Sequence, residues 1–258
     1  MSDNFNLNYI WQFRFETFLE AYSLQNSKNQ ENSEVKTGGF ESKEWKSRQI
    51  EMLNLALKAK LPRSTTIAEF LATQRYTNLI DFWGGPGWIW AWLVKSNLQG
   101  NLNYLNLELE SSRLAFEYLE QTLPRMKYIK FDDLSCISKA KNMLYANSIL
   151  QYFENNTHLL KVINATNPIT IVLDDVAGSN EDFFSLQNYY GYFQVNRFLS
   201  IDRLIEEISE LGYQLILCRP YEKYFSPKMS PRIWLGQEGR PDCDIPESLT
   251  LVFEKFES

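Results

Sequence analysis

The residues best suited to chemistry lie where an apolar strand leads through an acid into a glycine-rich turn: Asn78-Leu79-Ile80-Asp81-Phe82-Trp83-Gly84-Gly85-Pro86-Gly87. Glycines let the backbone approach a bound nucleotide because no side chain intervenes. Residues 88–94, which follow, are apolar enough for a buried helix, and the free N–H groups at a helix start attract polar ligand groups. The segment predicts a strand, turn and helix that bind an adenosine-type cofactor.

Three adenosine-type ligands make different demands on such a turn. A phosphate-binding loop needs Gly-Lys-Ser/Thr, but Gly87 is followed by Trp88. A dinucleotide fold needs Gly-x-Gly-x-x-Gly, whereas here Asp81 comes first. The acid-first order is typical of S-adenosylmethionine sites, where the carboxylate helps place the methionine portion and the glycines pass under the ribose. The turn therefore favours S-adenosylmethionine.

Acids also close the strand predicted next along the chain. A carboxylate at such a strand end can accept hydrogen bonds from both ribose hydroxyls, and Glu108 and Glu110 are the candidates. Glu110 is the first choice because Ser111 and Ser112 then open a helix. The alternative is a solvated strand end whose acids favour the following helix N-terminus.

Polar residues follow the fourth predicted strand, at the edge where open α/β sheets bind ligands. Asn147 and Ser148 come first, and Gln151 comes shortly after. His158 is the only histidine, so a histidine triad or a multi-histidine metal site has no second imidazole. We expect a structural role for His158 and no metal.

Two long segments are candidates for the acceptor site. Residues 174–200 are rich in Asp, Phe, Tyr, Asn and Gln, and long connections in compact folds are usually functional or disordered. Residues 219–247 combine arginine with aromatic residues, which suits a phosphorylated or sugar-bearing ligand, although a surface excursion or dimer contact explains them equally well. The residues expected to contact the acceptor are Gln151, Gln187, Tyr189 and Arg219.

The composition fits one globular α/β domain with additions. The chain has 258 residues, of which 44% are hydrophobic. Its net charge of −6 gives no electrostatic footprint for nucleic acid, and no membrane span is expected. The three cysteines lack metal or redox spacing, and the first residues lack the pattern of a secretory signal. We therefore expect a cytoplasmic protein, of undetermined oligomeric state, that acts on a small molecule.

Strands and helices alternate from residue 78 onward, which predicts a mostly parallel sheet covered on both faces. Strands are expected over 79–83, 102–109, 127–131, 142–146, 169–174, 213–218 and 249–256, the last as an antiparallel hairpin with its predecessor. Helices are expected over 87–98, 111–122, 149–165 and 200–211. Before the sheet we expect helices over 9–24, 45–57 and 64–76, with a mobile loop over 25–36.

This order resembles the class I S-adenosylmethionine-dependent methyltransferases. It is more closely similar to a bacterial methyltransferase family often encoded among surface-polysaccharide genes. The segments that carry the resemblance are 81–87, Asn147-Ser148-Ile149-Leu150-Gln151-Tyr152, Asp182-Phe183-Phe184-Ser185-Leu186-Gln187-Asn188, 15–21 and Gly39-Phe40-Glu41-Ser42. The chain departs from the family at Trp83, where a third consecutive glycine is usual, and near Asp174 and Asp175, where an arginine is usual.

The resemblance implies a Rossmann-like, seven-stranded methyltransferase sheet with helices on both faces. Residues 1–77 would form an N-terminal helical extension and residues 78–258 the S-adenosylmethionine-binding domain. Asp132 and Asp133 would read the adenine amino group or cap a helix, and Asn147 and Ser148 would lie beside the methyl group. The implied cofactor contacts are Asp81, Trp83, Gly84, Gly85, Gly87, Glu108, Glu110, Asp132, Asp133, Asn147 and Ser148.

We therefore expect an O-methyltransferase for a sugar or phosphorylated intermediate of capsule or surface polysaccharide biosynthesis, with S-adenosylhomocysteine as product. The reaction would be an in-line displacement, with Asp175, Asp174 or Tyr190 as proton acceptor. Two alternatives stay open. A nucleotide-sugar dehydrogenase or epimerase would need Gly-x-Gly-x-x-Gly and a Tyr-x-x-x-Lys pair, and a methyltransferase-like binding protein would keep the fold without turnover.

Overall fold

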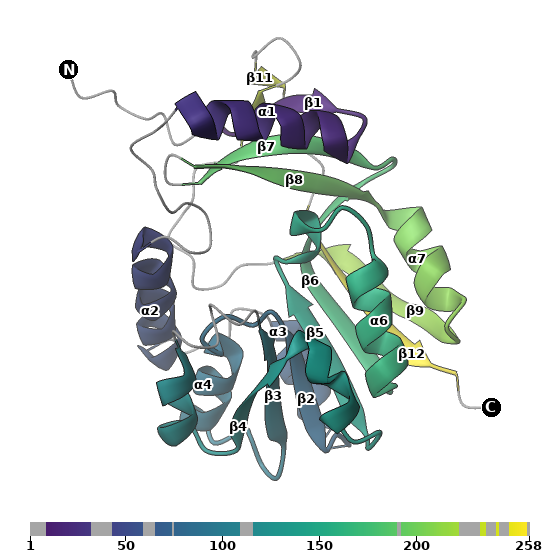
Figure 1. The fold of residues 1–258 in the computed structure, drawn as a ribbon. Coiled ribbons are helices and arrows are strands. Elements are labelled where there is room, and N and C mark those ends of the chain that lie inside the picture. The colour runs from purple at the N-terminus through teal and green to yellow at the C-terminus, as the bar shows by residue number, and fades with distance from the viewer. Residues whose placement is uncertain are drawn as a thin grey trace.

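The computed structural model describes residues 9–31, 43–58, 65–73, 75–108, 116–189, 192–221, 233–235, 241–242 and 248–256. Strands among these residues form one hydrogen-bonded network of twelve. The expected number of seven is therefore too small for the chain as a whole. The network consists of a main sheet of seven strands and a cap sheet of five, which meet where two strands pair (Figure 1).

The main sheet is predominantly parallel. Its order is β4 (Met126–Lys130), β3 (Asn103–Glu108), β2 (Asn78–Phe82), β5 (Asn142–Asn147), β6 (Thr170–Ser179), β12 (Ser248–Lys255) and β9 (Tyr213–Pro220). The pairs among β4, β3, β2, β5 and β6 are parallel, while β12 lies antiparallel between β6 and β9. The predicted antiparallel hairpin at the end of the sheet is confirmed.

Helices cover both faces of the main sheet because its central strands are buried on both sides. One face packs against α2 (Lys43–Lys58), α3 (Thr65–Leu71) and α4 (Trp88–Lys95). The other face packs against α6 (Thr157–Thr166) and α7 (Ile201–Ser209). Three short 3₁₀ helices complete the connections, namely η2 (Glu117–Gln121), η3 (Phe131–Cys136) and η4 (Leu150–Tyr152).

Among the helices predicted after the glycine turn, two differ from the structure. The helix expected over 149–165 is broken into η4 and α6, which starts only at Thr157. The helix expected over 111–122 lies partly outside the described residues, and its described end forms η2. The helix expected over 200–211 is confirmed as α7, whose first turn is capped by the Ser200 side chain accepting from the Arg203 N–H.

The cap sheet has the order β11 (Pro241–Asp242), β10 (Ile233–Leu235), β1 (Tyr9–Phe15), β7 (Phe183–Tyr189) and β8 (Tyr192–Ser200). Figure 1 shows β7, β8 and helix α1 (Phe18–Glu31) above the end of the main sheet toward which β6 runs. The helix expected over 9–24 is therefore wrong for residues 9–15, which form a strand. The connection expected over 174–200 is also wrong, because it forms the end of β6 and the β7–β8 hairpin.

Polar residues of α1 complete the outer edge of β8. The Gln25 side-chain oxygen accepts from the Val195 N–H at 2.7 Å, and the Asn29 amide both accepts from the Phe193 N–H and donates to its carbonyl, each at 2.9 Å. A strand edge left unpaired would expose such groups. The mobile loop expected over 25–36 is thus wrong for residues 25–31, which end α1, while residues 32–36 lie outside the described residues.

A buried ionic network fastens the cap sheet to the helices of the main sheet. The Arg197 side chain is only 1% exposed, and it pairs with Asp182 at 2.8 Å and donates to the Asn156 oxygen at 2.9 Å. Asp182 also accepts from the Ser200 N–H at 2.7 Å, next to the start of α7. Asp182, which begins one of the segments that carry the family resemblance, therefore has a structural role.

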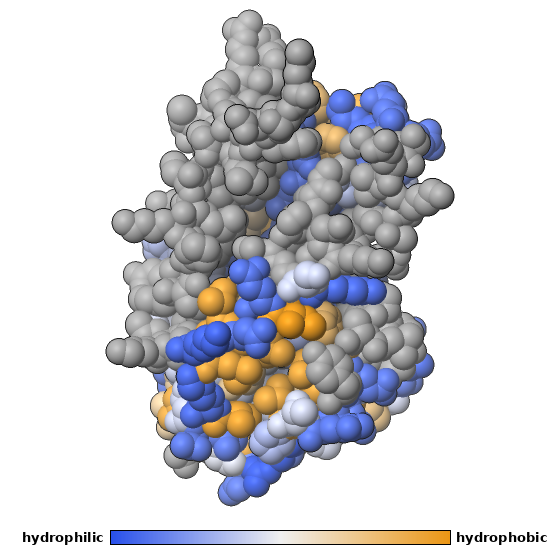
Figure 2. All heavy atoms as spheres, turned by 90° about the vertical axis from the view of Figure 1, so that its left-hand side faces the viewer, coloured by the Kyte–Doolittle hydropathy of each residue, from blue (hydrophilic) through white to orange (hydrophobic). Residues whose placement is uncertain are grey.

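Apolar side chains also gather on the outer surface. Figure 2 shows the side of the molecule that carries α2 and α4, with an apolar area over the lower half. Ile50 and Leu57 of α2 and Leu98, which follows α4, are among the exposed large apolar residues of the described chain. Within the described part of the chain, no helix has the length and apolar character needed to cross a membrane.

Candidate active site

The glycine turn after β2 is folded tightly over Asp81. A Cβ atom on Gly84 would stand 2.2 Å from the Asp81 Oδ2, so only glycine fits there. Gly85 and Gly87 have φ values of +58° and +79°, in the left-handed region that favours glycine. Gly87 precedes α4 directly, so the turn delivers the backbone to the helix start, as the sequence predicted.

Two side chains of β3 hold this turn in place. The Gly84 N–H donates to the Asn106 Oδ1 at 3.2 Å, and the Asn106 amide donates to the Gly85 carbonyl at 2.7 Å. The Gly85 N–H donates to the Glu108 Oε2 at 2.9 Å. Glu108 therefore meets the turn at the position expected for a ribose contact. Asn106, which is fully buried, was missed by the sequence reasoning.

Asp81 is buried beneath the turn and has a specific partner. The Tyr104 hydroxyl donates to the Asp81 Oδ2 at 2.5 Å. Burial, followed by the nearby Asp81 charge, raises the pKa of Tyr104 well above its ordinary value of 10. The hydroxyl therefore stays protonated and keeps donating, which fixes the carboxylate under Gly84.

A second cluster lies at the carboxyl ends of β5 and β6. The Ser148 hydroxyl and the Ser248 hydroxyl both donate to the Asp175 carboxylate, and the Thr250 hydroxyl donates to Asp174 at 2.6 Å. Both aspartates are buried. The structure thus brings together three residues predicted for the site, Ser148, Asp174 and Asp175.

Left-handed backbone recurs on three neighbouring strands. Trp83 after β2, Ser148 after β5 and Asp175 within β6 have φ values of 57°, 56° and 55°. Such a conformation costs a residue other than glycine about 1–3 kcal/mol and is concentrated at functional sites. At Trp83 the ring packs 4.5 Å from Phe153, which offsets part of that cost. The glycine usual there in the similar family would avoid it.

Polar groups without partners lie beside this cluster. The Asn147 amide donates to the Tyr221 hydroxyl at 3.1 Å, but its Oδ1 is buried and meets no hydrogen-bond donor among the described residues. The Gln151 Oε1 is likewise buried and meets no hydrogen-bond donor among the described residues. Next to Gln151, the Tyr152 hydroxyl donates to the Gln187 Oε1 at 3.1 Å, which joins η4 to the cap sheet.

Other predicted residues are exposed, bind other parts of the protein or lie outside the described residues. Asp132 and Asp133 are exposed, and neither caps η3. Arg219 faces α3, where it donates to the Thr66 hydroxyl at 2.6 Å and pairs with Glu69 at 3.5 Å. Glu110 and Tyr190 lie outside the described residues, as does the Tyr189 side chain.

His158 has the structural surroundings that the sequence analysis expected. The centroid of its ring lies 5.2 Å from that of the Phe131 ring and 5.0 Å from that of the Phe153 ring, so the exposed His158 packs on an aromatic cluster. In the described part of the chain, no group of three or more His, Cys, Asp or Glu side chains is arranged for a metal ion.

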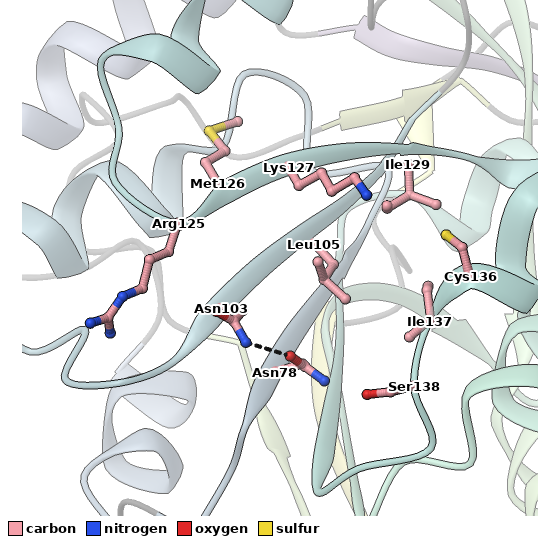
Figure 3. Close-up of a pocket in the computed structure, with 10 residues that line it drawn as sticks. All are labelled: Asn78, Asn103, Leu105, Arg125, Met126, Lys127, Ile129, Cys136, Ile137 and Ser138. Atoms are coloured by element: carbon pink, nitrogen blue, oxygen red, sulfur yellow. Dashed lines mark hydrogen bonds between the residues drawn. The ribbon is translucent and has the colours of Figure 1, made fainter.

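A surface pocket of about 340 Å³ lies at the opposite, amino end of the main sheet (Figure 3). Its floor is crossed by an amide ladder in which Asn103 donates to Asn78 at 3.0 Å and Asn78 donates to Asn142 at 2.8 Å. Arg125 and Cys136 contribute to its wall. The lining contains no residue predicted for the site, and the ladder amides bind one another.

With this geometry established, comparison with known proteins identifies the fold. In sequence, the chain matches no protein-family profile and no curated protein. In structure, it is similar to a chain of the complex between the Haloferax volcanii Trm112 methyltransferase activator and an assigned methyltransferase (12% identity, 83% of this chain and 95% of that chain covered, TM-score 0.54). It is also similar to a structure from Listeria monocytogenes described as an S-adenosylmethionine-dependent methyltransferase (14% identity, 81% of this chain and 100% of that chain covered, TM-score 0.50).

A third similar structure is the 1,6-didemethyltoxoflavin-N1-methyltransferase of Burkholderia thailandensis, solved with 1,6-didemethyltoxoflavin and S-adenosylhomocysteine (10% identity, 93% and 88% covered, TM-score 0.49). The two matches with TM-scores of 0.50 or more carry the conclusion. The chain has a mixed α/β fold with a mainly parallel sheet, like Rossmann-like methyltransferases.

Proposed function

We propose that this protein is an S-adenosylmethionine-dependent methyltransferase. The observation that carries the proposal is the turn itself, in which Gly84 closes over Asp81 with no room for a Cβ atom. A backbone stripped of side chains at a strand end is what a nucleoside needs for close approach. The methyltransferase-like fold supports the same conclusion.

The residues present fit this cofactor. The turn forms a cradle that side chains would fill. A Cβ atom on Gly84 would meet the Asp81 carboxylate, and a Cβ atom on Gly85 would come to within 3.0 Å of the Gln49 Oε1. Glu108 lies beside it with a carboxylate suited to ribose hydroxyls, and the buried Asn147 Oδ1 offers an acceptor for an ammonium group. When bound, the cofactor would supply a methyl group on a positively charged sulfur.

The chain's own part in the reaction is to hold the acceptor and to receive its proton. We propose Asp175 as the proton acceptor because two serine hydroxyls fix its carboxylate at the carboxyl end of β6. Asp174, which is bound by Thr250, and Tyr190 are the other candidates. Asp175→Asn should lower turnover about a hundredfold and leave cofactor affinity unchanged. Near-normal turnover in this variant with a large loss in Tyr190→Phe would move the role to the tyrosine.

For the acceptor, we propose a sugar or a phosphorylated intermediate of surface polysaccharide biosynthesis that is methylated on oxygen. The support is the family resemblance of segments 147–152 and 182–188, together with the polar side chains gathered at this edge of the sheet. Gln151, Gln187 and Tyr189 remain the residues proposed to contact it, whereas Arg219 is bound by Thr66 and Glu69 of α3.

Calorimetry with four ligands tests the assignment. We expect S-adenosylhomocysteine and S-adenosylmethionine to bind, and NAD and ATP not to bind. Preferential binding of NAD would favour a dehydrogenase or epimerase and contradict the proposal. Tight binding of S-adenosylmethionine without transfer to any acceptor would instead favour a binding protein that keeps the fold.

A further inference from the structure

The β7–β8 hairpin has two faces of different chemistry. Its register pairs Leu186 with Val195, and these apolar residues pack against Ala21 of α1. The alternate positions point to the other side, because side chains alternate along a strand. There the register pairs Gln187 with Gln194, and Ser185 with Asn196. We call the face that carries these four polar residues the amide face.

The amide face is turned toward the candidate active site. At one end of it, the Phe183 and Phe198 rings stack at 4.5 Å and pack with Ala177 of β6. Further along, Gln187 accepts from the Tyr152 hydroxyl of η4, which follows the carboxyl end of β5. Figure 1 shows the hairpin above this end of the main sheet. The amide face and the Ser148–Asp175 cluster therefore border the same region.

The arginines described around this region are already paired with carboxylates. Arg197 is bound to Asp182, and Arg219 is paired with Glu69. Arg14, which lies over the Phe183 ring, is 3.6 Å from Glu16. A phosphate group would need a cation that is free to bind it. Primary amides both donate and accept hydrogen bonds, which matches hydroxyl and amide groups instead.

We propose that the two half-buried glutamines of the amide face, Gln187 and Gln194, bind the methyl acceptor and select an uncharged molecule rich in hydroxyl or amide groups. Ser185 and Asn196 of the same face are fully buried and support the hairpin. Gln194 is the specificity residue, since its half-buried side chain forms no hydrogen bond with any other described residue and lies opposite Gln187. The inference rests on the proposed function and narrows it, because a phosphorylated acceptor is then excluded.

The test uses S-adenosylmethionine with a tritium-labelled methyl group and a small-molecule extract of the source cells. After incubation with the protein, unreacted S-adenosylmethionine, which is cationic, is removed on a cation exchanger, and the remaining labelled products are passed over an anion exchanger. We expect the label to elute without retention, and inorganic phosphate at matched ionic strength to leave the rate unchanged. Label retained on the exchanger and released by phosphatase treatment would overturn the proposal.

Variants then test the role of Gln194. We expect Gln194→Leu to lower kcat/KM for the isolated acceptor about tenfold, as loss of a buried hydrogen bond to ligand does, and Gln194→Asn to restore part of the loss. Gln214→Leu, an exposed glutamine of β9, is the matched control and should have no effect. Unchanged kcat/KM in Gln194→Leu would overturn the assignment.

Affinity for S-adenosylhomocysteine is measured by calorimetry on every variant. It separates a failure of the proposed function from a failure of the inference about the amide face. We expect it to be unchanged in Gln194→Leu, which also shows that the variant is folded. If the wild-type protein does not bind S-adenosylhomocysteine, the proposed function fails. If it binds and the label enters a phosphorylated product, only the inference about the amide face fails.

Discussion

The two ends of the main sheet carry polar residues on the same strands, yet the residues are used differently. At the amino end, the amides of Asn103, Asn78 and Asn142 bind one another across β3, β2 and β5. At the carboxyl end of β3, Asn106 and Glu108 bind the backbone of a turn, and next to it serine and threonine hydroxyls bind the buried carboxylates of Asp174 and Asp175.

This difference distinguishes a structural polar cluster from a functional one. Buried polar groups are normally all paired, and a fully paired ladder adds stability and specificity to the fold. At the carboxyl end, polar side chains instead hold a glycine turn and two buried carboxylates in place, which is the arrangement that the proposed cofactor and proton-acceptor roles need. Substitutions at the amino end should therefore change stability alone, while those at the carboxyl end should change ligand binding.

The largest effect is expected at the amino end, from Asn142→Leu. Asn142 accepts from Asn78 and donates to the Ser138 and Thr166 carbonyls at 2.9 and 2.7 Å. Leaving these buried partners unpaired should lower the free energy of unfolding by about 3 kcal/mol, measured by urea denaturation. Affinity of the folded variant for S-adenosylhomocysteine should not change. Asn101→Ala, at an exposed position, is the control. If Asn142→Leu lost affinity for S-adenosylhomocysteine but not stability, the proposed difference between the two ends of the sheet would be wrong.

At the carboxyl end, Gly84→Ala should mainly reduce cofactor binding. Its Cβ would collide with the Asp81 carboxylate, and relieving such overpacking costs about 1–3 kcal/mol. We expect affinity for S-adenosylhomocysteine to fall by about tenfold to a hundredfold. Gly100→Ala, where a Cβ meets nothing within 4 Å, is the control for calorimetry. Equal affinities in both variants would mean that the turn does not form the cofactor site.

Glu108→Ala should weaken S-adenosylhomocysteine binding about tenfold or more, since a hydrogen bond to a charged group contributes about 1.5–3 kcal/mol. It also removes the acceptor of the Gly85 N–H. Glu110→Ala, measured alongside by calorimetry, shows which of the two acids holds the ribose. Exposed Glu210→Ala serves as the control. Wild-type affinity in both the Glu108 and Glu110 variants would show that neither acid has this role.

The smallest effect is a pH dependence from Tyr104. Its pKa is higher in the folded protein than in the unfolded chain, so its contribution to stability is complete below about pH 10 and is lost as the pH rises toward the folded-state pKa. Between about pH 10 and its folded-state pKa, a tyrosine with a raised pKa should lower the unfolding free energy by about 1.4 kcal/mol per pH unit. Denaturation above pH 10 should therefore show a shallower decline in Tyr104→Phe than in the wild type.

Tyr213, whose pKa is also raised by burial, should give the same change when replaced by Phe. Tyr22→Phe, an exposed position on α1, is the control. If the unfolding free energy of Tyr104→Phe declines above pH 10 as steeply as that of the wild type, the Asp81–Tyr104 hydrogen bond does not hold the proton as described.

The main sheet could be predicted from the sequence because its strands are apolar runs between clear turn signals. That Asp81, Gly84, Glu108, Ser148 and Asp175 lie near the same edge of this sheet could be predicted in the same way, since carboxyl ends of parallel strands meet at one edge, and their roles stay predictions. Asn106 was not found, because its role depends on which turn crosses above it. That information is present only after β2 and β3 pair.

The cap sheet could not be predicted for a different reason. Trp11, Phe13 and Phe15 alternate with polar residues, which is the period of a strand, but the neighbouring Phe18 and Tyr22 suggested a helix running through them. The partner of β1 is β7, more than a hundred residues further on. Gln25 likewise reads as a loop residue until the edge of β8 is known.

The position of β12 has a consequence for the order in which the protein assembles during synthesis. β12 comes after β9 in the chain but lies between β6 and β9, and it is the only described strand that pairs with β9. Until residues 248–255 have left the ribosome, one edge of β6 is open and β9 has no neighbour to join. The nascent chain therefore carries an unsatisfied sheet edge from the synthesis of β6 until that of β12, and such an edge is the kind of surface that chaperones shield from aggregation.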